Sequence, residues 1–329
     1  MVNNLVSVCI PVYNGEQYLE DCLNSVLSQT YKHIEVIIID DGSNDNSINI
    51  IKKIQALDSR IRLVINDTNL GLVGNWNKCI EEANGNWIKF IFQDDVMNPL
   101  CIEKMIFACE KNNVKVCICS REFIIEDTAS DFLKDFFYNK VFQLEKVYQL
   151  QKKLTPGEVT NLAKDKLFSN FIGEPIVLLF HKDIIRKFGN YNADLVQLVD
   201  YEFALRICLN IDSFFLPEKL VQFRIHSDSA SNNQHSDNLK YIKNQFVEPI
   251  VMYHEYNFNA HYKLLRRKYG AFKLYKEAFF FYLYKKPAFS LPENLEKYLF
   301  QKYKGLKLLK LSIPIYLVLT KLKKFFSLK

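Results

Sequence analysis

Patterns typical of buried strands and of helices alternate along the first 120 residues. Continuous apolar runs at 5–12, 34–40, 61–66 and 87–92 are typical of strands covered on both faces. Between them, apolar residues recur at helical spacing and predict helices over about 18–27, 48–57 and 72–83. Asn98 and Pro99 have the features of a helix cap and a first helical position, for a helix that continues to about Asn112. The alternation predicts an α/β fold with a mainly parallel sheet flanked by helices.

Acidic residues follow two of the predicted strands directly. Asp40 and Asp41 end the second strand, and Asp94 and Asp95 come just after the fourth. In open α/β sheets the ligand site lies beyond the carboxyl ends of the strands, so we expect these carboxylates to meet at one edge. A divalent cation that bridges carboxylate and phosphate oxygens would balance their charge, and Mg²⁺ or Mn²⁺ suits such ligands.

Several motifs in this region match a known family. Residues 6–47, VSVCIPVYNGEQYLEDCLNSVLSQTYKHIEVIIIDDGSNDNS, resemble the N-terminal signature of family 2 glycosyltransferases. The resemblance continues through NLGLVGNWN (69–77), FIFQDDVMNP (90–99) and, more loosely, VDYEFALR (199–206), and it covers about 1–230. It implies a GT-A fold and the transfer of a sugar from a nucleotide-diphosphate sugar to an acceptor, with inversion at the anomeric carbon.

The resemblance also implies a nucleotide-sugar site. Asp41 matches a carboxylate that hydrogen-bonds the base, which favours uracil and therefore a UDP-sugar, whereas Asp40 is expected to brace the loop. The expected binding residues are Pro11, Val12, Tyr13, Asn14, Glu16, Asp41, Asn69, Gly71, Asn75, Gln93, Asp94 and Glu174. Of these, Glu174 is expected to hydrogen-bond a sugar hydroxyl.

The metal motif of the family is incomplete in this chain. Phe92 stands where the family has the first Asp of its DxD motif, and Gln93 takes the middle position. Asp94 is therefore expected to be the principal ligand of Mn²⁺ or Mg²⁺, with help from Asp95 and His226. The loss of one carboxylate predicts a weak metal site.

A carboxylate near the acceptor hydroxyl has to serve as the catalytic base. The family has a Glu-Asp pair at this point, and here Val199 replaces the Glu. Asp200 matches the base, and Glu202 is the second candidate. The alternative is that both are solvated residues at the start of a helix.

Two local patterns and the cysteines carry structural predictions without a function. Trp76 lies on an apolar helical stripe and is expected in the core. TPGE (155–158) predicts a capping box from Thr155 to Glu158. The eight cysteines lack the spacing of a zinc site, and we expect reduced thiols, with Cys117 and Cys119 in the core.

The charge of the chain is divided unequally. Residues 240–329 contain 19 Lys and Arg against 5 Asp and Glu. We expect a catalytic domain at 1–235, with a nucleotide-sugar half at 1–120 and an acceptor half at 121–235, followed by a helical, basic region at 236–329. The charge-free run 311–319 is too short to span a bilayer, which needs ~20 residues, so the basic region is expected to lie on an anionic membrane surface. The alternative is a helical domain with solvated lysines.

The leading hypothesis is an inverting glycosyltransferase of cell-surface polysaccharide biosynthesis. Its expected acceptor is a glycan or a lipid-linked saccharide, and its expected place is cytoplasmic, peripheral on the inner face of the cell membrane, with no nucleic-acid partner. A nucleotidyltransferase is a second reading, but it would need a basic loop after the first strand, which PVYNGEQYLE lacks. A non-catalytic protein that binds nucleotides, or nucleic acid through its basic tail, is the third.

Overall fold

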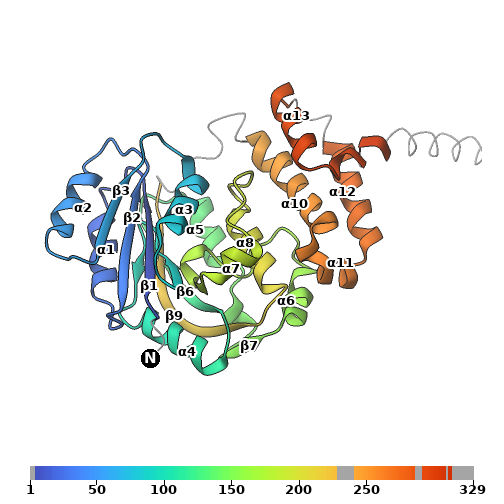
Figure 1. Cartoon of the computed structure of the whole chain (residues 1–329). Coiled ribbons are helices and arrows are strands. Elements are labelled where there is room, and N and C mark those ends of the chain that lie inside the picture. The colour runs from blue at the N-terminus through green and yellow to red at the C-terminus, as the bar shows by residue number, and fades with distance from the viewer. Residues whose placement is uncertain (1–3, 228–240, 286–290, 309, 313–329) are drawn as a thin grey trace, which may run out of the picture. The chain divides into compact units, whose positions relative to one another are not determined.

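The computed structural model describes residues 4–227, 241–285, 291–308 and 310–312 (Figure 1). The chain divides into two compact units, Met1–Asn232 and Asn233–Lys329. The expected domain boundary at 235/236 lies outside the described residues, as does most of the run 311–319.

Within the described residues, nine strands of the first unit form one sheet. They are β1 (Val6–Val12), β2 (Ile34–Asp40), β3 (Ile61–Ile65), β4 (Trp87–Phe90), β5 (Val96–Met97), β6 (Val116–Ile125), β7 (Lys152–Leu154), β8 (Leu178–His181) and β9 (Ser213–Ile225). The strand order is β3-β2-β1-β4-β8-β6-β9-β5, and β7 pairs with β9. The helices are α1 (Leu19–Leu27), α2 (Ser47–Gln55), α3 (Gly71–Glu82), α4 (Cys101–Asn112), α5 (Asp131–Asp135), α6 (Pro156–Ala163), α7 (Asp183–Phe188) and α8 (Val199–Cys208), with short 3₁₀ or π turns at Phe136–Lys140, Leu144–Lys146 and Pro175–Val177.

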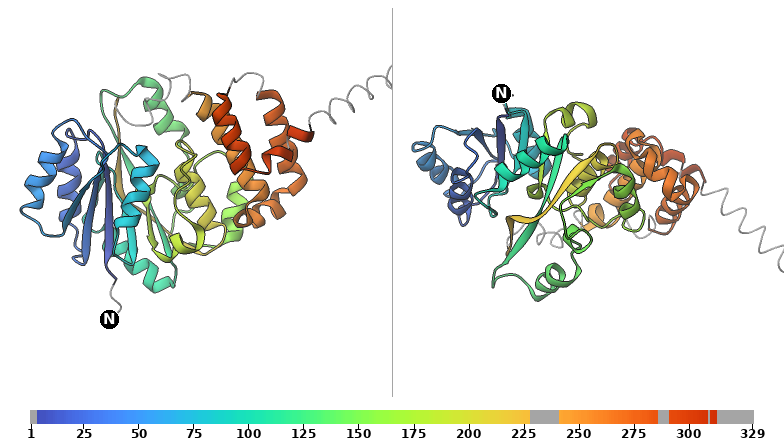
Figure 2. Two further views of the ribbon diagram at one scale, coloured as in Figure 1. Left: turned by 45° about the horizontal axis from the view of Figure 1, so that its top comes forward. Right: turned by 90° about the horizontal axis from the view of Figure 1, so that it is seen from below.

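The first half of the sheet is parallel. Strand β1 pairs with β2 and β4, and β2 pairs with β3. Every residue of β1 is buried, as its continuous apolar run requires. The chain reverses direction across the sheet between β3 and β4, so α1 and α2 lie on one face and α3 lies on the other (Figures 1 and 2). Open sheets place their ligands at such a reversal, here beside the ends of β1 and β4.

The second half adds short antiparallel pairings to the sheet, whose longer ladders are parallel as predicted. Strand β8 is antiparallel to β4 and β6, β9 is parallel to β6, and β5 and β7 are antiparallel to β9. The β6–β9 ladder shifts register between Cys119 and Arg121, and such irregularities turn a side chain to a new direction.

Helix α4 starts later than predicted and ends where it was predicted. Its first residue is Cys101, because the Oδ1 of Asn98 accepts a hydrogen bond from the backbone N of Leu100 (3.0 Å) and so closes a turn ahead of the helix. It ends at Asn112, followed by Asn113 in the left-handed region (φ 50°), a common way to end a helix.

The structural predictions for the core are confirmed. All eight cysteines are buried free thiols. Trp76 is 5% exposed and stacks on Phe92, with ring centroids 5.0 Å apart. In the capping box, Glu158 Oε2 accepts from Thr155 N (3.0 Å) and Thr155 Oγ1 accepts from Glu158 N (3.4 Å).

The second unit is helical, as predicted. Its described helices are α10 (Glu248–Phe258), α11 (Lys263–Tyr269), α12 (Ala271–Lys285) and α13 (Glu293–Lys302), with short turns at Lys243–Val247 and Ala260–Tyr262. Leu265 and Leu274 are buried inside it. Over the part of the chain that the structure describes, no helix has the length and apolar character needed to cross a bilayer.

Candidate active site

Hydrogen bonds join the loop after β1 to the loops after β2 and β4. The backbone N of Tyr13 donates to Gln93 Oε1 (2.8 Å), and Gln93 Nε2 donates back to Tyr13 O (3.1 Å). Asn14 takes a left-handed conformation (φ 49°), and its N donates to Ser43 Oγ (2.9 Å). A Cβ on Gly15 would lie 2.4 Å from Gln93 Oε1, so any other residue at position 15 would displace the Gln93 side chain from these hydrogen bonds. Gln93 thus fixes the first loop.

Glu16 turns toward the start of α2. Its backbone N donates to Asp45 Oδ2 (2.9 Å), and its Oε2 accepts from the N of Asn46 (2.8 Å). These bonds brace the loop that holds Tyr13 and Asn14.

Protein donors surround both carboxylates at the end of β2. Asp40 Oδ1 accepts from the N of Gly42 (3.1 Å) and Ser43 (3.0 Å), and its Oδ2 accepts from Ser43 Oγ (2.5 Å), so Asp40 braces the loop as expected. Asp41 Oδ1 accepts from Asn66 Nδ2 (2.8 Å) and Leu70 N (2.7 Å), and its Oδ2 accepts from Gly71 N (2.9 Å). Protein N–H and O–H groups thus stabilise Asp40 and Asp41, so of the four carboxylates expected to meet a cation, Asp94 and Asp95 are the pair left to do so.

The residues at the start of α3 hold this arrangement in place. Asn69 Nδ2 donates to Asp41 O (2.9 Å), and Asn75 Nδ2 donates to Ile39 O (3.1 Å). Gly71 has a φ of 74°, which an L side chain rarely adopts. Asn69 and Gly71 thus contact Asp41 directly, and Asn75 holds the end of β2 just before it.

The two acidic residues after β4 have different environments: Asp94 contacts a histidine, and Asp95 lies in the interior. Asp94 Oδ2 lies 3.0 Å from His226 Nε2. Asp95 is fully buried, and its Oδ1 accepts from the backbone N of Arg224 (2.8 Å). Its Oδ2 has no hydrogen-bond partner among the described residues. Burial, together with the charge of Asp94, raises the pKa of Asp95 well above its usual value.

The residues of the expected metal site fit a cation that the substrate helps to hold. No group of three or more His, Cys, Asp and Glu residues is placed to hold a metal within the described parts of the chain. The carboxylate of Asp94 and the imidazole of His226 are nevertheless oriented to each other. Asp95 follows Asp94 in sequence, and its buried Oδ2 has no donor within the described parts of the chain. Mg²⁺-type sites often use one or two protein ligands and complete the shell with phosphate oxygens and water. Asp94 is a carboxylate of this kind with His226 next to it, and their role as metal ligands stays a prediction.

Asp200 lies at the N-terminus of α8. Its Oδ2 accepts from Asn170 Nδ2 (2.9 Å), and its Oδ1 accepts from the N of Tyr201 (2.6 Å). Burial and the nearby charge of Glu174 raise the pKa of Asp200 to about 7. Glu174 in turn forms an ion pair with the buried Arg121 (Nε to Oε2, 2.6 Å). Asp200 can therefore exchange a proton near neutral pH.

Glu202 has a different environment. It is 1% exposed, and both of its oxygens accept from Arg206, at 2.8 and 2.9 Å. The guanidinium also donates to the backbone oxygens of Phe188, Gly189 and Asn190. This buried network favours a structural role for Glu202 and leaves Asp200 as the better candidate base.

Comparison with known proteins identifies the family. The family described as Glycosyl transferase family 2 matches residues 7–168. EpsH of Bacillus subtilis (strain 168), which is named as a glycosyltransferase, is 30% identical over 250 residues, or 75% of this chain and 67% of EpsH. The chain belongs to glycosyl transferase family 2. The uncharacterized protein MT1568 of Mycobacterium tuberculosis (strain CDC 1551 / Oshkosh) is 30% identical over 216 residues, which make up 66% of each chain, just under two thirds of that relative's length.

Solved structures resemble this family 2 member in fold. TarS 1-349 of S. aureus in complex with UDP-GlcNAc has a TM-score of 0.55 at 15% identity, over 84% of this chain and 81% of that one. The mannosyltransferase PcManGT from Pyrobaculum calidifontis, in complex with GDP-Man and Mn²⁺, has a TM-score of 0.55 at 14% identity, over 99% of this chain and 88% of that one. The GT-A type fold expected from the sequence is confirmed.

Three residues of the site in this family 2 member were missed from the sequence. Arg224 donates to Asp94 O (2.9 Å) and lies over the ring of Tyr18 (4.5 Å), while Arg121 and Asn170 hold Glu174 and Asp200. A weak signal existed, since a charged residue inside an apolar strand is rarely buried unless it is paired. Both arginines interrupt such runs, in CSREF and FRIH.

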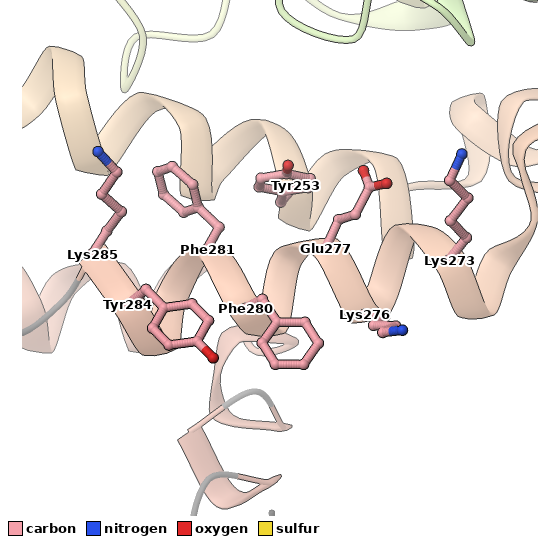
Figure 3. Close-up of a pocket in the computed structure, with 8 residues that line it drawn as sticks. All are labelled: Tyr253, Lys273, Lys276, Glu277, Phe280, Phe281, Tyr284 and Lys285. Carbon is pink, nitrogen blue, oxygen red and sulfur yellow. The ribbon is translucent and has the colours of Figure 1, made fainter.

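An open hollow lies within the second unit, along α10 and α12. Figure 3 shows Lys273, Glu277, Phe281 and Lys285 on the side of α12 that is turned toward Tyr253 of α10. Lys276, Phe280 and Tyr284 project to the opposite side. Both sides of α12 therefore carry lysine together with aromatic side chains.

Proposed function

We propose that the protein transfers a sugar, with inversion, from a nucleotide-diphosphate sugar of the UDP class to a hydroxyl of a glycan or lipid-linked saccharide, in cell-surface polysaccharide biosynthesis. The observation that carries the proposal is Asp200, a carboxylate at the start of α8 whose pKa of about 7 suits a base at neutral pH. Asp94 and His226 form a separate polar pair that suits the phosphate end of the donor.

In the proposed reaction, the acceptor oxygen attacks the anomeric carbon while Asp200 takes the proton of that hydroxyl. The bond from the anomeric carbon to the diphosphate oxygen breaks with its electron pair on the diphosphate, and the attack from the opposite face inverts the centre. Asn170 and the N–H of Tyr201 hold the Asp200 carboxylate in place for this transfer. A bound Mn²⁺ or Mg²⁺ would neutralise charge on the leaving diphosphate, and Asp94 and His226 would hold it, with Asp95 behind them.

The assignment of the donor rests on Asp41. Its carboxylate accepts three protein hydrogen bonds, and a carboxylate has about four lone-pair positions, so one remains for the ring N–H of uracil. The complexes of TarS with UDP-GlcNAc and of PcManGT with GDP-Man and Mn²⁺ support a nucleotide-sugar donor and a divalent cation for this chain as well. Tyr13 and Asn14 would then lie against the nucleoside.

The basic second unit supports a place on the inner face of the cell membrane. Helix α12 carries both lysines and aromatic rings, and Phe272 is 81% exposed and Tyr284 is 67% exposed. Such surfaces bind the headgroup region of anionic membranes, where lipid-linked acceptors are held. Flotation with two kinds of vesicle tests this part: one kind contains neutral lipid only, and the other contains neutral and anionic lipid. Recovery of the protein with only the first kind, or with neither kind, would contradict it.

The decisive test incubates the full chain with a panel of UDP-sugars, Mn²⁺ and a lipid-linked saccharide, and measures released UDP. We expect release with one sugar, and loss of at least ~100-fold in Asp200→Asn. Calorimetric titration with UDP, with and without Mn²⁺, tests the donor site independently. An Asp200→Asn protein with normal turnover would exclude the proposed base, and no heat with UDP under either condition would exclude the donor class.

A further inference from the structure

The loop at 170–174 is tied to Asp200 by one fully used amide. Asn170 Nδ2 donates to Asp200 Oδ2 (2.9 Å) and to Gly173 O (3.0 Å). Asn170 Oδ1 accepts from the backbone N of Ile172 (3.1 Å) and Gly173 (2.9 Å). An amide has two donor and two acceptor positions, so all four are occupied. A movement of the loop therefore moves the partner of Asp200.

The same loop brings a second carboxylate close to Asp200. Glu174 follows Gly173, whose φ of 120° sets the direction of the chain at that point. The Nε of Arg121 lies 2.6 Å from Glu174 Oε2, and the Arg121 side chain is only 3% exposed. The guanidinium also lies over the ring of Phe123, 5.3 Å from its centroid. The buried Arg121, at the register shift of the β6–β9 ladder, thus holds Glu174 in place.

We propose that Asn170 and the Arg121–Glu174 ion pair are positioning residues for Asp200: the Asn170 amide orients the Asp200 carboxylate, and the ion pair fixes the loop that carries this amide. The inference rests on the proposed role of Asp200 as base. Glu174 disfavours the charged form of Asp200, whereas the N–H of Asn170 favours it, so the two act in opposite directions. Arg121 limits the effect of Glu174 by balancing its charge.

The other titratable groups near Asp200 that we considered do not influence its protonation in this way. Burial keeps the pKa of Tyr191 well above its usual value, so its hydroxyl is neutral in the relevant range. On α8 itself, Glu202 and Arg206 neutralise each other through two hydrogen bonds. A single substitution at Glu174 removes its charge and therefore its effect on the protonation of Asp200.

The test is a direct titration of Asp200 in the full chain, without substrate. Carboxyl carbons of ¹³C-labelled aspartate are followed by NMR against pH, and the Asp200 signal is the one absent from Asp200→Asn. We expect Glu174→Gln to lower the midpoint pH of the Asp200 titration by ~0.5 pH units or more. Asn170→Asp keeps the two acceptor contacts but replaces the N–H donor with a charge, so it should raise this midpoint. Glu82→Gln, which breaks a surface ion pair with Arg62, is the matched control and should leave it unchanged.

Arg121 is tested by a double-variant cycle. Arg121→Met alone should raise the midpoint, and Arg121→Met with Glu174→Gln should bring it below the wild-type value, because no charge on residue 174 remains. Urea unfolding of each variant identifies loss of fold. Midpoints of Glu174→Gln and Asn170→Asp that both stay at the wild-type value would overturn the inference, even if Asp200→Asn is inactive. Opposite shifts of these two midpoints support the inference. Turnover by Asp200→Asn would exclude only the proposed role of Asp200 as base.

Discussion

The buried ion pair of α8 allows one stability prediction to be worked out in detail. Arg206→Met removes a guanidinium that is 5% exposed and leaves Glu202, 1% exposed, without its cation. The loss of one partner of a buried pair typically costs about 3–5 kcal/mol. The backbone oxygens of Phe188, Gly189 and Asn190 also lose donors, so we expect the upper part of this range. Such a loss is a large share of a domain's usual stability of about 5–15 kcal/mol.

The matched variant removes both charges. In Glu202→Leu with Arg206→Met, no unpaired charge remains, and such replacements are often neutral or stabilising relative to the pair. Urea unfolding followed by circular dichroism gives the free energy of each protein by linear extrapolation. We expect the double variant to be more stable than Arg206→Met by roughly 2 kcal/mol or more. Equal stability of the two, or a single variant within ~1 kcal/mol of wild type, would refute the reasoning.

Three further predictions concern the site. The pKa of Asp200 near 7 means that a proton occupies the base at lower pH, so kcat/KM should fall as the pH drops below about 7 and level off above it; a flat profile from pH 5 to 8 would contradict this. Gly173→Ala should cost about 1–3 kcal/mol in urea unfolding, because of its φ of 120° and because the added Cβ would lie 2.9 Å from Arg121 Nη1; an unchanged midpoint would count against it. His226→Ala should weaken Mn²⁺-dependent binding of UDP by about tenfold or more in calorimetry, with Mn²⁺-free binding as the control; equal Mn²⁺ effects in both proteins would remove His226 from the metal site.

The parallel half of the fold could be predicted from the sequence because its signals are local. Each strand from β1 to β4 is one apolar run, and the helices between them repeat at the helical period. The second half depends on pairings far apart in sequence, such as β6 with β9 and β4 with β8. Strand β5 has two residues, too few to show any periodicity. Local pattern therefore could not show that the sheet is mixed.

The site shows the same division between local and distant contacts. The acidic residues could be found because they follow strands, but the sequence could not show that Asp41 is stabilised by the backbone N of Leu70 and Gly71, since every residue has such a group. The contact of Arg224 with Asp94 spans 130 positions. Side-chain type indicates which residues carry chemistry, and the fold decides which of them keep a free lone pair.

The distribution of the buried cysteines has a practical consequence. All eight thiols lie between Cys9 and Cys208, in the first unit, and residues 233–329 contain none. A thiol reagent can reach them only when the surrounding segment opens, so modification rates report the opening of the first unit segment by segment, from β1 (Cys9) to α8 (Cys208). The second unit contributes no thiol to this signal. Opening of the first unit can therefore be measured in the intact chain without a contribution from the second unit and without a label being engineered into the protein.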